Sequence, residues 1–204
     1  MKISGLAEFV GIMLGDGNLY SQESTGNYQI RIAFNSKNEY EYLIFVKNLA
    51  NKLFSKNFYI KYMKDKNCFH LCLSNKVLFY KLKKLCSNKK KIPLWIFKNR
   101  EYLKSCIRGL IDTDGSIFRM SKRDYRLIRI EFKNMNEKLL NDARKSLLLL
   151  GFHPSKIICN KEFFISRQEE IKRYVKEIGF NNPKNLKRFM QLAPSSSGQE
   201  FLLE

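Results

Sequence analysis

Two aspartates stand at the same place in two copies of one short motif. Residues 9–17 read FVGIMLGDG and residues 107–115 read IRGLIDTDG, which puts Asp16 and Asp114 98 residues apart, each before a glycine. A single Asp-Gly pair is more often a turn that ends a helix than a functional site. Two matching copies favour a functional site over a turn, because paired carboxylates supply the hard oxygen ligands that Mg²⁺ prefers. We therefore expect Asp16 and Asp114 to act together as ligands of a divalent cation.

The match between the two copies extends beyond the motif. Residues 30–39 (IRIAFNSKNE) align without a gap on residues 128–137 (IRIEFKNMNE), again 98 positions later. Two matching segments in one register indicate a tandem duplication. We predict one repeat over residues 1–95 and a second over 96–190. The tail at 191–204 is small and polar before a short apolar end, and we expect it to be frayed or foreign to the natural chain.

A helix is expected before each aspartate. Residues 4–15 place apolar side chains at helical spacing, with Ser4 as the predicted N-terminal cap. The second copy opens at Asn99, has Glu101 in its first turn and runs to about Thr113. Both helices should stop at Asp-Gly.

Each repeat continues with strands and further helices. Apolar and polar residues alternate over 28–34, the period of a half-buried strand, and the second copy repeats this at 128–132. The predicted fold is α+β, a pseudo-twofold duplication of an αββαββα unit with two antiparallel sheets. The remaining predicted elements are helices at 38–54, 75–87, 136–150 and 168–178, and strand pairs at 58–64 with 68–74 and 155–160 with 162–167.

The chain is strongly basic. Its 204 residues carry 38 Lys and Arg against 19 Asp and Glu, a formal net charge of +19. Basic side chains beside phosphates release condensed counterions, so we expect a polyanionic partner whose binding weakens steeply with salt. Charge alone does not separate nucleases from ribosomal proteins, splicing cofactors or repressors.

Neither a secretion signal nor a membrane span is predicted. The first apolar stretch is short, carries Glu8 and has no small-residue cleavage site after it. No apolar run approaches the roughly 18 residues that a span needs. The five cysteines are odd in number and lack CxxC spacing, which indicates neither a disulfide framework nor a zinc ribbon. We expect an intracellular protein of the cytoplasm, nucleoid or an organelle matrix, with no membrane partner.

The paired motifs resemble those of the LAGLIDADG homing endonucleases. The resemblance rests on the two nonamers within duplicated halves and covers about residues 4–190. It implies a monomer with pseudo-twofold symmetry, whose two motif helices pack along the symmetry axis and whose sheets form a saddle in the major groove of double-stranded DNA. It further implies a staggered double-strand break without a covalent enzyme intermediate, an activity that promotes intron mobility.

Small residues on both motif helices fit this implied packing. Gly11 and Gly15 are four apart and share a helix face, and Gly109 and Thr113 hold the equivalent positions. Close packing would bring together the two negative C-terminal ends and both aspartates. We predict a metal site made of the two aspartates with the preceding residues, Gly15 and Thr113. Mg²⁺ is the expected cofactor, Mn²⁺ should substitute, and Ca²⁺ should bind without supporting cleavage.

The family also places polar and basic side chains near its metals. Asp112 is not among our candidates, because its counterpart is Leu14, and we expect it to be a structural polar residue. Lys37 pairs with Met135, so at most one half has a lysine there. Phosphate contact or a solvated surface is an equal alternative for each lysine. The predicted catalytic helpers are Ser36, Asn134, Lys91, Lys184 and Lys187.

The outward residues of the strands are the predicted DNA-binding set. Arg and Gln suit readout of guanine and adenine edges, whereas lysine-rich loops grip phosphates. Two sheets over two half-sites imply a target of roughly 20 base pairs, and the differences between the halves make it asymmetric. For His70, a packed surface residue is an equal alternative. The set is Tyr20, Gln22, Gln29, Arg31, Lys37, Lys61 and His70 in the first half, and Arg119, Lys122, Arg123, Arg126, Arg129, Lys156 and Arg167 in the second.

Other functions on the same scaffold remain open. An intron-RNA-binding maturase is the main alternative, although retention of both aspartates favours cleavage. A transcriptional regulator of the WhiA kind would be expected to add a helix-turn-helix domain, for which the sequence leaves no residues. An intein origin is not expected, because the chain starts with Met and lacks flanking splicing blocks.

Overall fold

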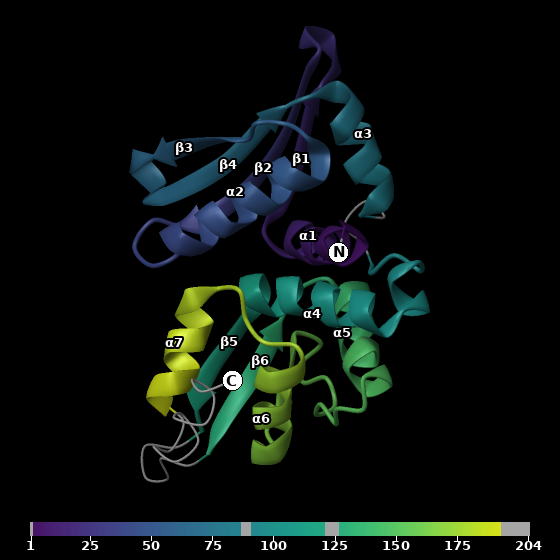
Figure 1. Ribbon diagram of the computed structural model, residues 1–204, viewed down its shortest axis with the longest axis vertical. Coiled ribbons are helices and arrows are strands. Elements are labelled where there is room, and N and C mark those ends of the chain that lie inside the picture. The colour runs from purple at the N-terminus through teal and green to yellow at the C-terminus, as the bar shows by residue number, and fades with distance from the viewer. Residues whose placement is uncertain (1, 87–90, 121–126, 193–204) are drawn as a thin grey trace.

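The computed structural model describes residues 2–86, 91–120 and 127–192. Two helices, α1 (Lys2–Gly15) and α4 (Arg100–Asp114), pack against each other at the centre of the molecule. A sheet with its own covering helices lies on either side of this pair (Figure 1). The α+β fold with two antiparallel sheets confirms the predicted fold class. No helix of the described stretches combines the length and apolar character needed to cross a membrane.

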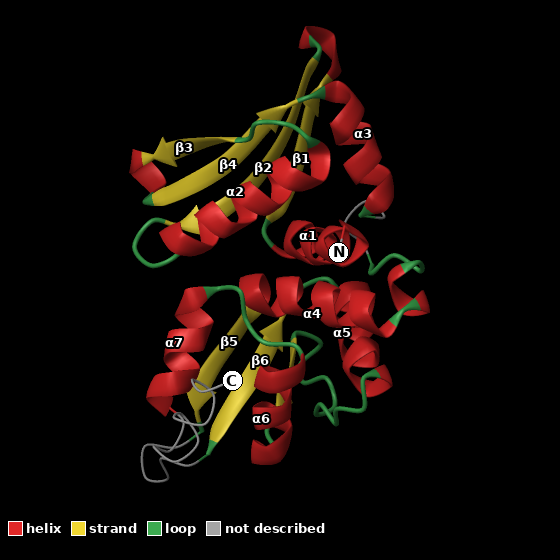
Figure 2. Cartoon of the chain, viewed as in Figure 1, coloured by secondary structure: helices red, strands yellow, loops and turns green. Residues whose placement is uncertain are grey.

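The first half follows the predicted element order (Figure 2). Its sheet has the strand order β1-β2-β4-β3, and all three pairings are antiparallel. Two short 3₁₀ turns, η1 (Glu23–Thr25) and η2 (Lys64–Lys66), close the two hairpins. The other elements are β1 (Gly17–Gln22), β2 (Asn27–Asn35), α2 (Tyr40–Phe54), β3 (Tyr59–Met63), β4 (Cys68–Ser74) and α3 (Lys76–Leu85).

The second half repeats this order with one strand fewer. A 3₁₀ turn, η4 (Ile96–Lys98), leads into α4, and the sheet has the order β5-β6-β7. Among the described residues, the final helix, α7, has no counterpart in the first half. The elements after α4 are β5 (Gly115–Arg119), β6 (Ile128–Lys133), α5 (Glu137–Leu149), β7 (Glu162–Ile165), α6 (Gln168–Glu177) and α7 (Pro183–Leu192).

Three element predictions were wrong in detail. The strand expected at 155–160 is not formed: the segment touches β7 through an isolated bridge between Ile158 and Glu162, and then turns through Cys159 and Asn160 in the left-handed region. Helix α7 was not predicted. Helix α1 begins at Lys2, so Ser4 lies inside it and is not its cap. Asn99 does cap α4, its side chain accepting from the amides of Glu101 and Tyr102 as the sequence pattern indicated.

The two central helices meet through glycines that are related by the repeat. A Cβ atom on Gly11 would lie 2.2 Å from the carbonyl oxygen of Cys106, and one on Gly109 would lie 2.4 Å from that of Glu8. Each contact is the other's equivalent, because Gly11 corresponds to Gly109 and Glu8 to Cys106. Such reciprocity is the signature of a twofold interface. Backbone-to-backbone contact this close explains why only glycine fits.

Lack of space for a side chain also explains the glycines that follow the two aspartates. Gly115 has an extended backbone (φ −93°), so the left-handed conformation is not what requires glycine there. A Cβ on Gly17 would lie 2.6 Å from Met13 Cα, and one on Gly115 would lie 2.4 Å from the carbonyl oxygen of Ile111. The chain can thus turn directly from each helix end into the first strand of its repeat.

Candidate active site and nucleic-acid interface

The two predicted metal-binding aspartates lie at the adjoining C-terminal ends of α1 and α4. A Cβ on Gly15 would be 2.1 Å from Thr113 Oγ1 and 3.3 Å from Asp114 Oδ2, so the carboxylate of Asp114 lies against the last turn of α1. Asp16 is exposed, and Asp114 is half-buried. Helix C-terminal ends carry partial negative charge, which favours a cation between them.

A cavity of about 520 Å³ opens beside Asp114. Residues 133–136, the loop that leaves β6, form one wall, and Leu14 and Gly15 of α1 contribute to another. Asn134 donates from Nδ2 to Asp114 Oδ2 at 2.7 Å, and its Oδ1 accepts from the Asn136 amide, also at 2.7 Å. Both ends of the Asn134 amide are therefore fixed, and it orients the carboxylate. The structure brings this predicted helper to its aspartate.

Ser36, the counterpart of Asn134, has a different contact. Its hydroxyl donates to the backbone oxygen of Asn67 at 2.6 Å, and its amide donates to the same oxygen at 3.1 Å. Ser36 therefore anchors the loop after β2 to the β3–β4 hairpin. The contact of Ser36 is therefore not the equivalent of the contact between Asn134 and Asp114.

The three lysines predicted as helpers do not line the Asp114 cavity. Lys184 Nζ lies 2.5 Å from Glu39 Oε1, and Lys187 Nζ lies 3.6 Å from Glu41 Oε2. Lys91 lines a separate cavity near the end of α3. These contacts give the predicted catalytic role of the lysines no support.

Asp112 is fully buried, in agreement with the structural role expected for it. Burial raises its pKa to about 7, although hydrogen bonds from Asn181, Asn185 and Asn182, just before and within α7, act in the opposite direction. Asn181 donates its amide to Oδ2 at 2.8 Å, and Asn185 donates Nδ2 to Oδ1 at 3.3 Å. Asn182, also fully buried, donates to the backbone oxygen of Asp112 at 3.0 Å. The asparagine-rich run 181–185 thus supplies the hydrogen-bond partners of Asp112, the aspartate that has no counterpart in the first repeat. We did not predict these contacts.

An ion pair between buried Glu8 and partly buried Arg108 crosses the central helix interface. Arg108 Nη2 lies 2.7 Å from Glu8 Oε2, and its Nε donates to Oε1 at 3.2 Å. Arg108 also donates to the backbone oxygen of Ile178, and Asn181 donates to Glu8. This pair has no symmetric copy, since Val10 stands at the position equivalent to Arg108. It joins α1, α4 and the segment before α7.

The side chains at the two helix ends supply only part of the ligands that one shared cation needs. Among the described residues, no three or more His, Cys, Asp or Glu side chains form a cluster that could hold a metal alone. Two carboxylates at helix ends leave most positions of an octahedral hard cation open. Gly15 and Thr113 do meet across the interface, as expected from their equivalence.

The outward face of the first sheet carries the predicted DNA-contact residues of this half except Lys37, which lies in the turn after β2. The pairings Tyr20 with Gln29 and Lys61 with His70 put each pair on neighbouring strands. Arg31 donates from Nε to Gln29 Oε1 at 2.8 Å, and its guanidinium lies 5.2 Å from the centre of the Tyr20 ring. Burial lowers the pKa of His70 below its usual value, and the nearby charges of Arg31, Lys66 and Lys61 act in the same direction. Gln22, at the exposed end of β1, is two residues from Tyr20 and therefore faces the same side of the sheet.

The second sheet presents a different outward face. Phe118 pairs with Arg129, whose guanidinium lies 5.1 Å from the centre of the Phe164 ring. Glu131 accepts from the Ser116 hydroxyl at 2.8 Å. Phe118 and Phe164 also lie on this face, their ring centres 6.3 Å apart, and we did not predict either as a DNA contact. Of the predicted residues on this half that the structure describes, Arg129 alone lies in the sheet on its outward face.

The other predicted contacts of the second half lie elsewhere. Arg119 pairs with buried Ile128, and its guanidinium donates to the Gln191 backbone oxygen in α7, so the outward assignment was wrong. Arg167 lies past β7 at the start of α6, 3.5 Å from Glu170. Lys156 is exposed beside β7 but outside any strand. Lys122, Arg123 and Arg126 lie outside the described residues.

Sequence comparisons identify both repeats. Residues 8–105 match the LAGLIDADG DNA endonuclease family, and residues 101–179 match the LAGLIDADG-like domain. A DNA polymerase of Thermococcus hydrothermalis is 30% identical over 75% of this chain and 9% of its own length. The helicase Hel308 of Methanocaldococcus jannaschii is 29% identical over 72% of this chain and 12% of its own length. The chain thus spans about a tenth of the curated relatives that it matches.

Solved structures share the fold. A mesophilic variant of the homing endonuclease I-DmoI is 22% identical with a TM-score of 0.64, covering 88% of this chain and 97% of that one. The N-terminal LAGLIDADG domain of DUF199/WhiA is 18% identical with a TM-score of 0.61, covering 90% and 87%. The homing endonuclease I-WcaI is 12% identical with a TM-score of 0.58, covering 92% and 86%. With a family match in each half and the paired motif helices at its centre, the chain belongs to the LAGLIDADG family as a member with two motifs.

Proposed function

We propose that this chain is a site-specific homing endonuclease that makes a staggered double-strand break and thereby promotes intron mobility. The target would be an asymmetric DNA site of roughly 20 base pairs, read in the major groove by a monomer. The observation that best supports this proposal is the position of Asp16 and Asp114 at adjoining helix ends, where Gly15 contacts Thr113. One carboxylate per repeat at a pseudo-twofold axis suits one cut per strand.

A divalent cation is part of this proposal, with Mg²⁺ as the cofactor, Mn²⁺ as a substitute and Ca²⁺ as a ligand that does not support cleavage. When bound, such an ion would polarise the scissile phosphate and lower the pKa of an attacking water. The two aspartates would hold it with help from Gly15 and Thr113, and phosphate oxygens and water would complete its coordination. The related I-DmoI structures include complexes with DNA and Mn, Ca or Mg.

The chain's own residues would position the DNA and the carboxylates. Asn134 holds Asp114 through its Nδ2, so the carboxylate has one orientation before DNA binds. The linked side chains of Tyr20, Gln29 and Arg31 are pre-ordered on the first sheet, which lowers the entropy cost of base readout. Arg129 would play the equivalent part on the second sheet. We place the protein in a host compartment that contains the DNA target.

The experiment that tests this function is selection from a randomised duplex library. The protein would be incubated with the library and Mg²⁺, and the cut ends sequenced, with the Asp16→Asn/Asp114→Asn double variant as the control. We expect one long asymmetric site with staggered ends from the parent and none from the control. Recovery of no DNA site, together with selective binding of a structured intron RNA, would favour the alternative function of a maturase.

A further inference from the structure

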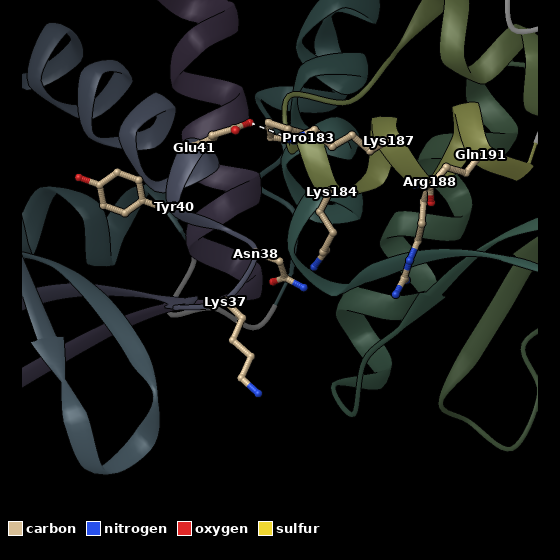
Figure 3. Close-up of a pocket in the computed structure, with 9 residues that line it drawn as sticks. All are labelled: Lys37, Asn38, Tyr40, Glu41, Pro183, Lys184, Lys187, Arg188 and Gln191. Carbon is tan, nitrogen blue, oxygen red and sulfur yellow. Dashed lines mark ion pairs between the residues drawn. The ribbon is translucent and has the colours of Figure 1, made fainter.

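A cleft of about 440 Å³ separates the first half from α7 (Figure 3). Its first wall is the segment from Lys37 to Glu41, between β2 and α2, and its second wall is one face of α7. The side chains of Lys37, Asn38, Lys184 and Arg188 all extend toward the same open side (Figure 3). Cationic side chains thus converge on this opening from both repeats.

Two ion pairs join the walls of this cleft. Lys184 Nζ lies 2.5 Å from Glu39 Oε1, and these side chains are only 23% and 12% exposed. Asn182 also donates to Glu39 Oε1, which strengthens this link between the two walls. Lys187 and Glu41 are 3.6 Å apart and both 68% exposed, so their pair contributes little to stability. The charges of Lys184 and Lys187 are thereby matched by carboxylates within the walls.

Lys37 and Arg188 are the unmatched charges. Both are exposed, and in the part of the chain that the structure describes neither side chain has an acidic partner. They lie on opposite walls of the cavity. Two unpaired cations on opposite walls, with the walls joined by the Lys184–Glu39 ion pair, would attract an anion placed between them.

The correspondence between the two repeats assigns the first wall of the cleft to the Asp16 side of the active site. The loop 36–38 corresponds to 134–136, which lines the Asp114 cavity. In that second copy the place of Lys37 is taken by Met135, and no helix like α7 follows the first repeat in the described residues. The cationic cleft therefore exists on one side of the pseudo-twofold axis.

We propose that this cleft binds one backbone phosphate of the DNA, with Lys37 and Arg188 as its ligands, near the cut on the Asp16 side. The inference rests on the proposed function, because it takes duplex DNA as the partner. Phosphate contacts fix register without reading sequence. The strand on this side would be gripped by a contact that the other strand lacks.

The test compares DNA binding by the Lys37→Gln/Arg188→Gln variant and the parent in metal-free buffer. Each phosphate that the protein neutralises adds about 0.9 to the slope of log affinity against log salt, so loss of this one phosphate contact should make the slope shallower by about one. The charge-conserving Lys37→Arg/Arg188→Lys variant should keep the parent slope. Lys172→Gln, on the exposed face of α6, should keep it too. Unchanged melting temperatures would confirm that all variants are folded.

Phosphate ethylation interference locates the contact. Ethylation of one phosphate on one strand should weaken binding by the parent and should no longer matter to the Gln variant. If the parent and the Gln variant show the same salt slope and the same ethylation pattern, the proposal that the cleft binds a phosphate is refuted. The endonuclease proposal would still stand. A parent that binds no duplex at all would overturn both.

Discussion

Asn134 Nδ2 lies 2.7 Å from Asp114 Oδ2, and the same side chain accepts from the Asn136 amide through Oδ1. The amide is thus held at both ends, and it holds the carboxylate in turn. Its counterpart Ser36 is bonded to Asn67 instead, so this support belongs to one repeat.

Replacement of Asn134 by alanine should weaken catalysis. Loss of a residue that orients a metal-binding carboxylate costs roughly 10- to 100-fold in activity or metal affinity. We expect Asn134→Ala to need a higher Mg²⁺ concentration for half-maximal cutting, measured on a plasmid carrying the target, while metal-free DNA binding stays at the parent level. Asn141→Ala, which removes an exposed side-chain contact on α5, is the control and should titrate like the parent. Identical metal titrations for Asn134→Ala and the parent would refute the positioning role.

The central helix interface should reject any side chain at Gly11. The added Cβ would stand 2.2 Å from a backbone oxygen, so the helices must separate, and we expect Gly11→Ala to lose about 3 kcal/mol of unfolding free energy. Gly5→Ala on the same helix meets only the movable tips of Leu49 and Leu53, at 3.3 and 3.7 Å. That control should stay within about 1 kcal/mol of the parent, helped by helix propensity. Urea denaturation measures both. Equal stability of the two variants would show that the helices are not packed this closely.

The ion pair between Glu8 and Arg108 should be costly to break. Removing one partner of a buried pair leaves an uncompensated charge, at a cost of about 3–5 kcal/mol. We expect Arg108→Met to be destabilised by this order in denaturant unfolding. Lys104→Met, on the same helix and paired with exposed Glu101, should change stability by less than about 1 kcal/mol. A loss for Arg108→Met no larger than for Lys104→Met would contradict the role of the pair.

Glu170 should make stability depend on pH. Burial raises the pKa of this carboxyl, but hydrogen bonds from His153, with the His153 and Arg167 charges, outweigh it and lower the pKa below its usual value. A lowered folded pKa gives stability that is present above the unfolded pKa and lost as pH falls through the folded one. We expect Glu170→Gln to be about 1–2 kcal/mol less stable than the parent at pH 7. At pH 3 the gap should be much smaller, and a gap equal at both pH values would argue against this linkage.

The repeat made much of the fold predictable. The common offset of 98 positions located both motif helices, the strands after them and the equivalence of Gly11 with Gly109. It also marked Asn134 as a candidate, and the structure places that residue on Asp114. These features follow from local periodicity and from comparison of the two copies.

What the sequence did not predict depends on contacts of the second half that the first half lacks. Helix α7 is anchored by Asn182 and Asn185 to buried Asp112, a tertiary match without an internal copy to reveal it. Arg119 was misplaced because strand parity is set by pairing, although apolar Ile117 two residues earlier carries the signal for the buried face. The DNA contacts as a whole stay predictions.

The central claim is that Asp16 and Asp114 act as a pair, one for each strand. The most direct test measures cutting of a supercoiled plasmid carrying the selected site by Asp16→Asn, Asp114→Asn and the double variant, with Mg²⁺. Glu169→Gln, exposed on α6, is the control and should cut like the parent. We expect no double-strand break from any of the three aspartate variants, with DNA binding largely intact. Full double-strand cutting by the Asp16→Asn/Asp114→Asn variant would contradict the account.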